Sequence, residues 1–258
     1  MKSPNTSIFV LSHQDDEIGI FEILRLALKN KKRVYIFYMT NGAIKTEIPK
    51  NKIFYRDKES MSVLKNFGLK SKNVIFFGRL YNIPTCYLYK KLDVAYKKLN
   101  NFINKIPGKV EIYTHVWEGG NEDHDACNIL VKKIMNSSKK INSAYAFPLY
   151  NADTKYFFYK VQKFIKKDKK TLKIKTNFTN RIKYIKYLFY YKSQTRVWIG
   201  LYPFLIKNFL FNDYSEIQYI TKNLNFKKPH QGQLLYEKFK RCNYYDFKKS
   251  IKSFLRKN

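Results

Sequence analysis

The feature that most constrains the fold is an alternation, over the first 150 residues, of short apolar runs with longer segments of helical periodicity. The apolar runs predict strands, and the segments between them carry apolar residues three or four positions apart, which predicts amphipathic helices. Helices between strands favour parallel βαβ units, so we expect an α/β fold. The predicted strands are 8–11, 34–39, 74–77, 110–114 and 144–147, and the predicted helices are 17–30, 56–67, 88–106 and 125–135.

The second half of the sequence is less regular. It shows neither an internal repeat nor a Gly/Ser-rich linker, so we divide the chain into a domain over residues 1–195 and a basic, aromatic C-terminal extension over 196–258 that packs on it. The expected elements are a helix or hairpin within 154–173, a helix at 181–193, an apolar run at 197–206 interrupted by Pro203, and a terminal helix within 234–255.

Three acidic residues and a histidine follow the first predicted strand, in the run S-H-Q-D-D-E at residues 12–17. His13 and Asp16 are three positions apart, so a single turn can aim both at one ion, and imidazole with carboxylate is a ligand set that zinc accepts. Asp15 would then remain as a free carboxylate beside the metal. The alternative is helix capping, because acidic side chains suit a helix N-terminus.

A second polar loop, E-G-G-N-E-D-H-D-A at residues 118–126, follows the fourth predicted strand. Ligands of open parallel sheets bind beyond the carboxyl ends of the strands, so the two loops should face one crevice. His124 is then a third metal ligand, and Asp123 can orient a neighbouring ring. His115, at the end of the strand, is a further imidazole within reach. We interpret the remaining histidine, His230, as a surface turn residue.

Together the two loops resemble the motifs A-H-P-D-D-E and H-P-D-H of the PIG-L/LmbE-like de-N-acetylase family. The resemblance covers roughly residues 6–194 and includes further motifs in the same order. They are Thr40-Asn41-Gly42 for T-x-G, Arg56 and Glu59 for R-x-x-E, Phe67-Gly68 for L-G, and Tyr191-Lys192-Ser193-Gln194 for Y-x-S-Q.

The resemblance implies a Rossmann-like three-layer sandwich with a mostly parallel sheet and one zinc ion per active site. It also implies hydrolysis of the amide of an N-acetylated amino sugar, with Asp15 as general base and with Arg56 and Asn41 as substrate-binding candidates. Fe²⁺ or another divalent ion is an alternative to zinc, because the same ligand set accepts several metals. The implied ligands are His13, Asp16 and His124.

One departure from the family pattern affects the chemistry. The first histidine of H-P-D-H is Asn121 here, and an asparagine can donate a neutral hydrogen bond but supplies no proton at pH 7. We expect His115 to take over the lost imidazole role, which makes Asn121 and His115 candidate catalytic residues. The alternative is a slow or inactive family member that binds a sugar or acts as a scaffold.

The net charge of +32 is unevenly distributed, with +12 over residues 1–150 and +20 over the rest. Such a field attracts phosphates, whether on nucleic acid, on anionic lipid or on a carrier-linked sugar. The run 197–206 lies between Arg196 and Lys207, which fits a membrane interface or a core helix. We expect a lipid- or nucleotide-linked sugar and peripheral contact with an anionic membrane. A nucleic-acid-binding protein is the other alternative, although no specific recognition motif is present.

The cysteine pattern and the apolar runs bear on the compartment. The three cysteines are scattered, so we expect neither a disulfide framework nor a zinc knuckle, and a reducing cytosol fits. The apolar run 8–11 is too short for a signal peptide core. We therefore expect a cytoplasmic protein with peripheral contact at the inner face of the membrane.

Overall fold

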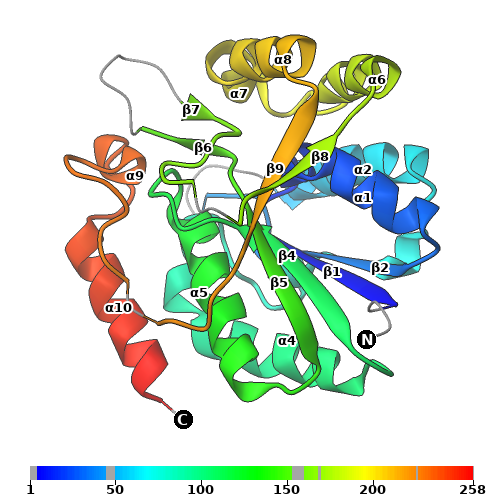
Figure 1. Cartoon of the computed structure of the whole chain (residues 1–258). Helices are drawn as coiled ribbons and strands as arrows, with labels where there is room; N and C mark the ends of the chain where they lie inside the picture. The colour runs from blue at the N-terminus through cyan, green and yellow to red at the C-terminus, as the bar shows by residue number, and fades with distance from the viewer. Residues whose placement is uncertain (1–4, 45–49, 153–159, 168–169, 225, 258) are drawn as a thin grey trace.

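The computed structural model describes residues 5–44, 50–152, 160–167, 170–224 and 226–257. Within these residues, seven strands form one sheet in the order β3-β2-β1-β4-β5-β9-β8 (Figure 1). The pairs from β3 to β5 are parallel, whereas β9 is antiparallel to both β5 and β8. The predicted α/β fold with a mostly parallel sheet is thus confirmed. The strands are β1 (Thr6–Leu11), β2 (Arg33–Tyr38), β3 (Val74–Ile75), β4 (Val110–His115), β5 (Ile141–Phe147), β8 (Leu172–Lys175) and β9 (Tyr214–Tyr219), and β6 (Tyr150–Asn151) pairs with β7 (Lys160–Val161) apart from this sheet.

Helices cover both faces of the sheet. Helices α1 and α2 pack on one face, and α4, α5 and α10 pack on the other. The helices are α1 (Phe21–Lys29), α2 (Lys50–Asn66), α3 (Phe77–Leu80), α4 (Leu92–Lys105), α5 (Glu122–Ser137), α6 (Phe178–Leu188), α7 (Thr195–Gly200), α8 (Tyr202–Phe211), α9 (Leu235–Lys238) and α10 (Tyr244–Arg256), with the 3-10 turns η1 (Asp16–Gly19), η2 (Ser71–Asn73) and η3 (Leu88–Lys90).

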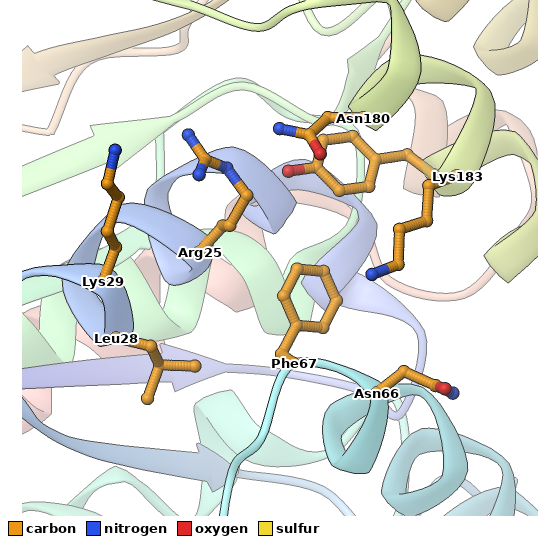
Figure 2. A pocket seen from close by; sticks show the side chains of 8 residues that line it. Arg25, Leu28, Lys29, Asn66, Phe67, Asn180 and Lys183 are labelled. Carbon is orange, nitrogen blue, oxygen red and sulfur yellow. The ribbon is translucent and has the colours of Figure 1, made fainter.

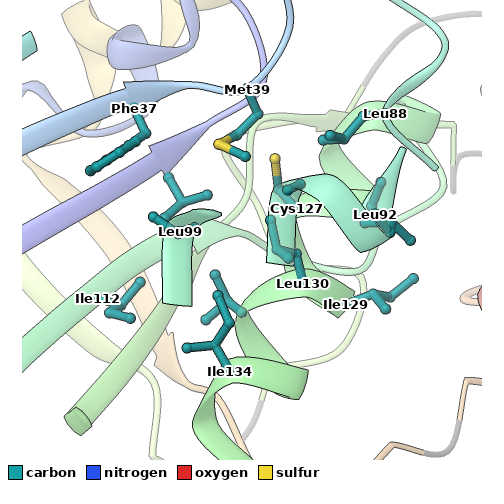
Figure 3. Packing of buried hydrophobic residues seen from close by; sticks show 14 of the residues in the cluster. Phe37, Met39, Leu88, Leu92, Leu99, Ile112, Cys127, Ile129, Leu130 and Ile134 are labelled. Carbon is teal, nitrogen blue, oxygen red and sulfur yellow. The ribbon is translucent and has the colours of Figure 1, made fainter. Parts of the chain in front are cut away.

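The central strand β1 shows why the sheet needs two helical layers. Successive side chains of a strand point to opposite faces. Ile8 and Val10 therefore pack in the cluster under α4 and α5, whereas Phe9 and Leu11 pack in the cluster under α1. Figure 3 shows the first cluster, in which side chains of β2, β4, α4 and α5 meet. A strand that is apolar on both faces is stable only between two layers.

Several element boundaries differ from the predicted ones for local reasons. The predicted helix 17–30 begins as the 3-10 turn η1 before α1, and the predicted helix 88–106 is divided in the same way into η3 and α4. Strand β3 is only two residues long because α3 begins at Phe77. Helix α5 begins three residues before the predicted start, because the side chain of Asn121 caps it by accepting a bond from the backbone N–H of Asp123.

The second half of the chain joins the sheet, which the sequence pattern did not indicate. Part of the predicted helix or hairpin at 154–173 lies outside the described residues, and the described remainder contains β7 and the start of β8. Strand β9 was not predicted, because its short and largely polar sequence resembles a loop. The C-terminal segment thus supplies a strand to the sheet and, through α10, side chains to the core. The domain boundary at 195/196 stays a prediction.

The apolar run 197–206 forms α7 and the first half of α8. Tyr202 and Leu205 are buried against α6, as expected for core helices. Ile199 and Phe211, by contrast, are 80% and 77% exposed, so the same two helices also present apolar surface to solvent. None of the helices in the described part of the chain combines the length and the apolar character that crossing a bilayer requires.

Candidate metal centre

The strand order places the two polar loops at one point. The chain leaves β1 toward β2 and β3, and later returns to β4 on the other side of β1. The connections after β1 and β4 therefore diverge, and such a switch point opens a crevice at the carboxyl ends of the strands. Residues 12–17 follow β1 and residues 116–125 follow β4, so the predicted convergence of the two loops is observed.

The predicted metal ligands meet in this crevice. His13, Asp16 and His124 each offer one donor atom, these atoms lie within 4.8 Å of one another, and all three residues are buried. The His124 Nε2 atom is 3.2 Å from Asp16 Oδ1, and the His13 Nδ1 atom is 3.5 Å from Asp16 Oδ2. Two imidazoles and a carboxylate in a buried pocket match the donor set of catalytic zinc sites.

Asp16 is the centre of this arrangement. Its Oδ2 atom accepts hydrogen bonds from the backbone N–H groups of Ser12, at 3.0 Å, and His13, at 2.7 Å. Burial raises the pKa of Asp16, but its interactions with His124, His115 and His13 outweigh burial and hold the pKa well below its usual range. Asp16 is thus an ionised and rigidly held carboxylate.

His13 is oriented by Asp123, as predicted for a second carboxylate in the loop. Asp123 Oδ2 lies 3.1 Å from His13 Nε2, and the same carboxylate accepts the backbone N–H groups of Cys86 and Leu88. An ionised carboxylate only accepts, so His13 donates from Nε2 and turns Nδ1 toward Asp16. Burial lowers the pKa of His13, but Asp16 and Asp123 raise it to about 10.

His115 lies beside the ligands and is fully buried. Its ring stacks on that of His124, with centroids 3.9 Å apart and an interplanar angle of 5°. Its Nε2 atom is 3.1 Å from Asp16 Oδ2. Burial, and next the neighbouring His115, lower the pKa of His124 to about 3, which keeps that ring neutral. His115 therefore contacts two of the three predicted ligands.

Asp15 and Arg56 form the next pair. Asp15 has φ of +132°, a conformation that costs free energy for a non-glycine residue, and its side chain makes no cap to the following turn η1, although Asp16 and Glu17 lie in the first turn of η1. Arg56 Nη2 lies 3.2 Å from Asp15 Oδ1 and also donates to the carbonyl of Gln14. Burial raises the pKa of Asp15 to about 7, although Arg56 lowers it.

The other family motifs support this loop. Arg56 also donates to the carbonyl of Gly42, where φ is +77° and an added Cβ would lie 2.5 Å from Gln14 Oε1. Asn41 Oδ1 accepts the backbone N–H of Ala43, so its oxygen shapes the turn, and a role in substrate binding stays a prediction. Glu59 does not pair with Arg56 but accepts the N–H and hydroxyl of Ser193.

Residues that the sequence did not single out complete the site. The Tyr150 ring contacts the His124 ring edge-on, with centroids 5.3 Å apart, and its hydroxyl is hydrogen-bonded to Asn121. Burial raises the pKa of Tyr150, so it is a neutral phenol, and the guanidinium of Arg241 faces it. Tyr150 is one of 22 tyrosines, and nothing in the local pattern marks it.

The remaining predicted features lie outside the centre. Glu17, of the first motif, is buried near Tyr191, of the Y-x-S-Q motif. Cys127 is buried against Ser12, as expected for a packing residue. His230 lies in a bend, where its Nδ1 atom is 2.8 Å from the Gln231 carbonyl oxygen, but it is only partly exposed.

Comparisons with known proteins agree with this geometry. The model of the PIG-L family, described as GlcNAc-PI de-N-acetylase, matches residues 8–135. A deacetylase of the teicoplanin biosynthesis pathway is 13% identical, with a TM-score of 0.62, and covers 83% of this chain and 96% of its own. The N,N'-diacetylchitobiose deacetylase of Pyrococcus horikoshii is 16% identical, with a TM-score of 0.61 and 89% coverage of both chains. At these identities the structural likeness establishes the fold. A search of curated proteins found no significant match.

Proposed function

The chain belongs to the PIG-L family, and from that premise we propose that it hydrolyses the acetamide of an N-acetylated amino sugar to acetate and a free amine. The observation that carries the proposal is the buried group His13, Asp16 and His124, which brings three metal-donor atoms within 4.8 Å of one another. The solved neighbours support the same reaction class, because they include deacetylases of teicoplanin biosynthesis and of N,N'-diacetylchitobiose.

We assign the metal to these three residues and take zinc as the ion. Zinc favours two imidazoles with one carboxylate, and such catalytic sites leave a position open for water or substrate. A structural neighbour described as the zinc-inhibited form of a teicoplanin deacetylase indicates that its own fold admits zinc, although Fe²⁺ suits the same donors. An ion held here would polarise the acetyl carbonyl and lower the pKa of a water molecule to about 7.

Asp15 is the general base in this proposal. It lies in the same loop, between the ligands His13 and Asp16, and a carboxyl group with a pKa of about 7 can both take a proton and return it near neutral pH. Arg56 holds the carboxylate by one oxygen and leaves the other free of that contact. Asp15 thus removes a proton from the attacking water and delivers it to the leaving amine.

Tyr150 and Asn121 are the proposed hydrogen-bond donors to the acetyl oxygen. They are hydrogen-bonded to each other beside the His124 ring, at the position where the family carries a histidine. A neutral phenol aimed at a developing negative charge stabilises it without needing to lose its own proton. His115 remains the competing candidate. Its full burial and its contacts with Asp16 and His124 favour a role in holding the ligands instead.

We further propose that α7 and α8 contact an anionic membrane, where a phosphate-linked sugar would be presented. Ile199 and Phe211 expose apolar side chains on these helices, and Arg196 and Lys207 are exposed beside them. Each nearby cation adds about 1 kcal/mol of attraction to an anionic surface. Co-sedimentation with phosphatidylglycerol vesicles should fall for Ile199→Asp with Phe211→Asp, and unchanged binding would contradict this contact.

The first experiment measures bound metal per chain by mass spectrometry, in the wild type and in His124→Ala. We expect about one ion per wild-type chain and its loss in the variant, because removing His124 leaves only two of the three donor residues. Amine release from N-acetylglucosamine and UDP-N-acetylglucosamine follows, with Asp15→Asn as the control that keeps metal but loses roughly 10²–10⁴-fold in rate. A metal-loaded protein that releases no amine would support the inactive family member instead.

A further inference from the structure

A cavity of about 340 Å³ lies between α1, the end of α2 and α6 (Figure 2). None of its lining residues belongs to the metal centre. Its volume is at the lower end of the few hundred Å³ that are usual for small-molecule sites. The lining residues are Arg25, Leu28 and Lys29 of α1, Asn66 and Phe67 at the end of α2, and Asn180, Lys183 and Tyr184 of α6.

The charge of the lining is one-sided, with three cationic side chains and no carboxylate. The buried Glu22, which does not line this cavity, accepts two hydrogen bonds from Arg25, at 2.9 and 2.6 Å. It accepts a third from the hydroxyl of Tyr184, at 2.5 Å. Glu22 therefore neutralises Arg25 alone. Within the described part of the chain no ion pair joins Lys29 or Lys183 to an acid, so the cavity keeps two uncompensated positive charges.

A neighbouring cavity of about 450 Å³ provides an internal comparison. It lies on the other side of Arg25 and also contains Lys175 and Arg181, but Glu22 and Asp213 line it as well. The guanidinium of Arg181 is already used, because it donates to backbone carbonyls at the end of α8. The second cavity thus has two carboxylates beside its three cations, whereas the first has three cations and no carboxylate.

We propose that the first cavity binds a phosphate monoester, with the phosphate held by cationic side chains of the lining and the esterified ring toward Phe67 and Leu28. Two lysines match the charge of a phosphate monoester, which is close to −2 at neutral pH. Figure 2 shows the Lys183 ammonium reaching from α6 toward Phe67, while the amide of Asn180 points toward Arg25. Asn66 donates its amide to the carbonyl of Ser62, so its side-chain oxygen is left to accept from a ligand hydroxyl.

Sugar phosphates and nucleoside monophosphates share this chemistry. The wall offers one aromatic ring, Phe67, which also packs against Phe21 and Tyr184. A base would gain from contact with that ring, whereas a sugar would gain from the amides of Asn66 and Asn180. The site is separate from the proposed catalytic reaction, so its ligand binding is measured without any activity assay.

The test is isothermal titration of the full chain at constant ionic strength with inorganic phosphate, glucose 6-phosphate and AMP, and with glucose and adenosine as uncharged controls. The cavity variants are Lys29→Gln and Lys183→Gln. Two matched variants, Lys31→Gln and Lys186→Gln, remove the same charge from exposed positions close by that do not line the cavity.

We expect one saturable site for a phosphate ester and no binding of glucose or adenosine. Each cavity variant should weaken binding about tenfold, as the loss of one charge-assisted hydrogen bond implies, and each matched variant should stay within about twofold. Tighter binding of AMP or of glucose 6-phosphate would identify the ring, and either result supports the site. Equal weakening by the matched variants would attribute binding to the general positive field of the chain and overturn the proposal, as would the absence of saturation below about 10 mM.

Discussion

Replacing Asp123 by asparagine should weaken metal binding without removing a ligand. Asp123 accepts three hydrogen bonds, from His13 Nε2 at 3.1 Å, Cys86 N at 2.6 Å and Leu88 N at 3.0 Å. Asparagine has one acceptor oxygen, so it can serve either Leu88 or the other two donors, and its amide then faces a donor. His13 loses the contact that turns Nδ1 toward Asp16. Loss of such an orienting partner costs about 10–100-fold in metal affinity, or roughly 1.4–2.7 kcal/mol.

The matched control is Asp125→Asn in the same turn of α5. Asp125 is equally buried and accepts the backbone N–H groups of Glu118 and Gly119, but within the described part of the chain its carboxylate bonds to no histidine. Asp123→Asn should lose about 1–3 kcal/mol of unfolding free energy in the metal-free protein, because it leaves a buried N–H without a partner. Asp125→Asn should lose less, because Asp125 Oδ1 accepts both N–H groups and the asparagine oxygen can take its place. Zinc affinity, measured by competition with a chromogenic chelator, should fall for Asp123→Asn only. Equal affinities for the two variants would refute the assigned role of Asp123.

Three further outcomes follow from the same structure. Gly120→Ala should lower the thermal midpoint, at a cost of about 1–3 kcal/mol, because its Cβ would lie 1.9 Å from the Tyr150 carbonyl oxygen; an unchanged midpoint would contradict this packing. Tyr150→Phe should reduce kcat about 100-fold at unchanged metal content, and an unaltered kcat would exclude Tyr150 as an oxyanion donor. Burial raises the pKa of Glu237, but bonds from Leu234 N and Tyr244 N outweigh burial and lower it below 4.5. Its contribution to stability is therefore complete above that pH and lost in more acidic solution, and urea unfolding of Glu237→Gln should show a weaker loss below about pH 4 than the wild type.

The parallel half of the fold could be predicted because the sequence patterns that specify its strands and helices are local. Each apolar run from β1 to β5 is buried on both faces, and the helices between them carry one apolar stripe, so short windows of sequence contain the pattern. Strand β9 escaped prediction for the opposite reason. Its residues become a strand through pairing with β5 and β8, and these partners lie up to about 70 residues away in the chain.

Local sequence by itself determined the ligand types and their spacing. His13 and Asp16 are three residues apart in one turn, and His124 lies in a loop of the same kind after another parallel strand, so their convergence follows from the topology of the fold.

Only the tertiary structure decided which side chains surround them. Tyr150 contacts His124 and bonds to Asn121 because the chain that follows β5 places β6 beside the metal centre, and Asp123 turns toward His13 across 110 positions of sequence. The cavity between α1 and α6 has the same origin. No local sequence pattern distinguishes Lys29 and Lys183 from the other lysines. They line one cavity only because α1 and α6, which are distant in sequence, lie close together in the fold. Periodicity reports which face of an element is buried, whereas contacts between distant elements depend on packing that no short window of sequence contains.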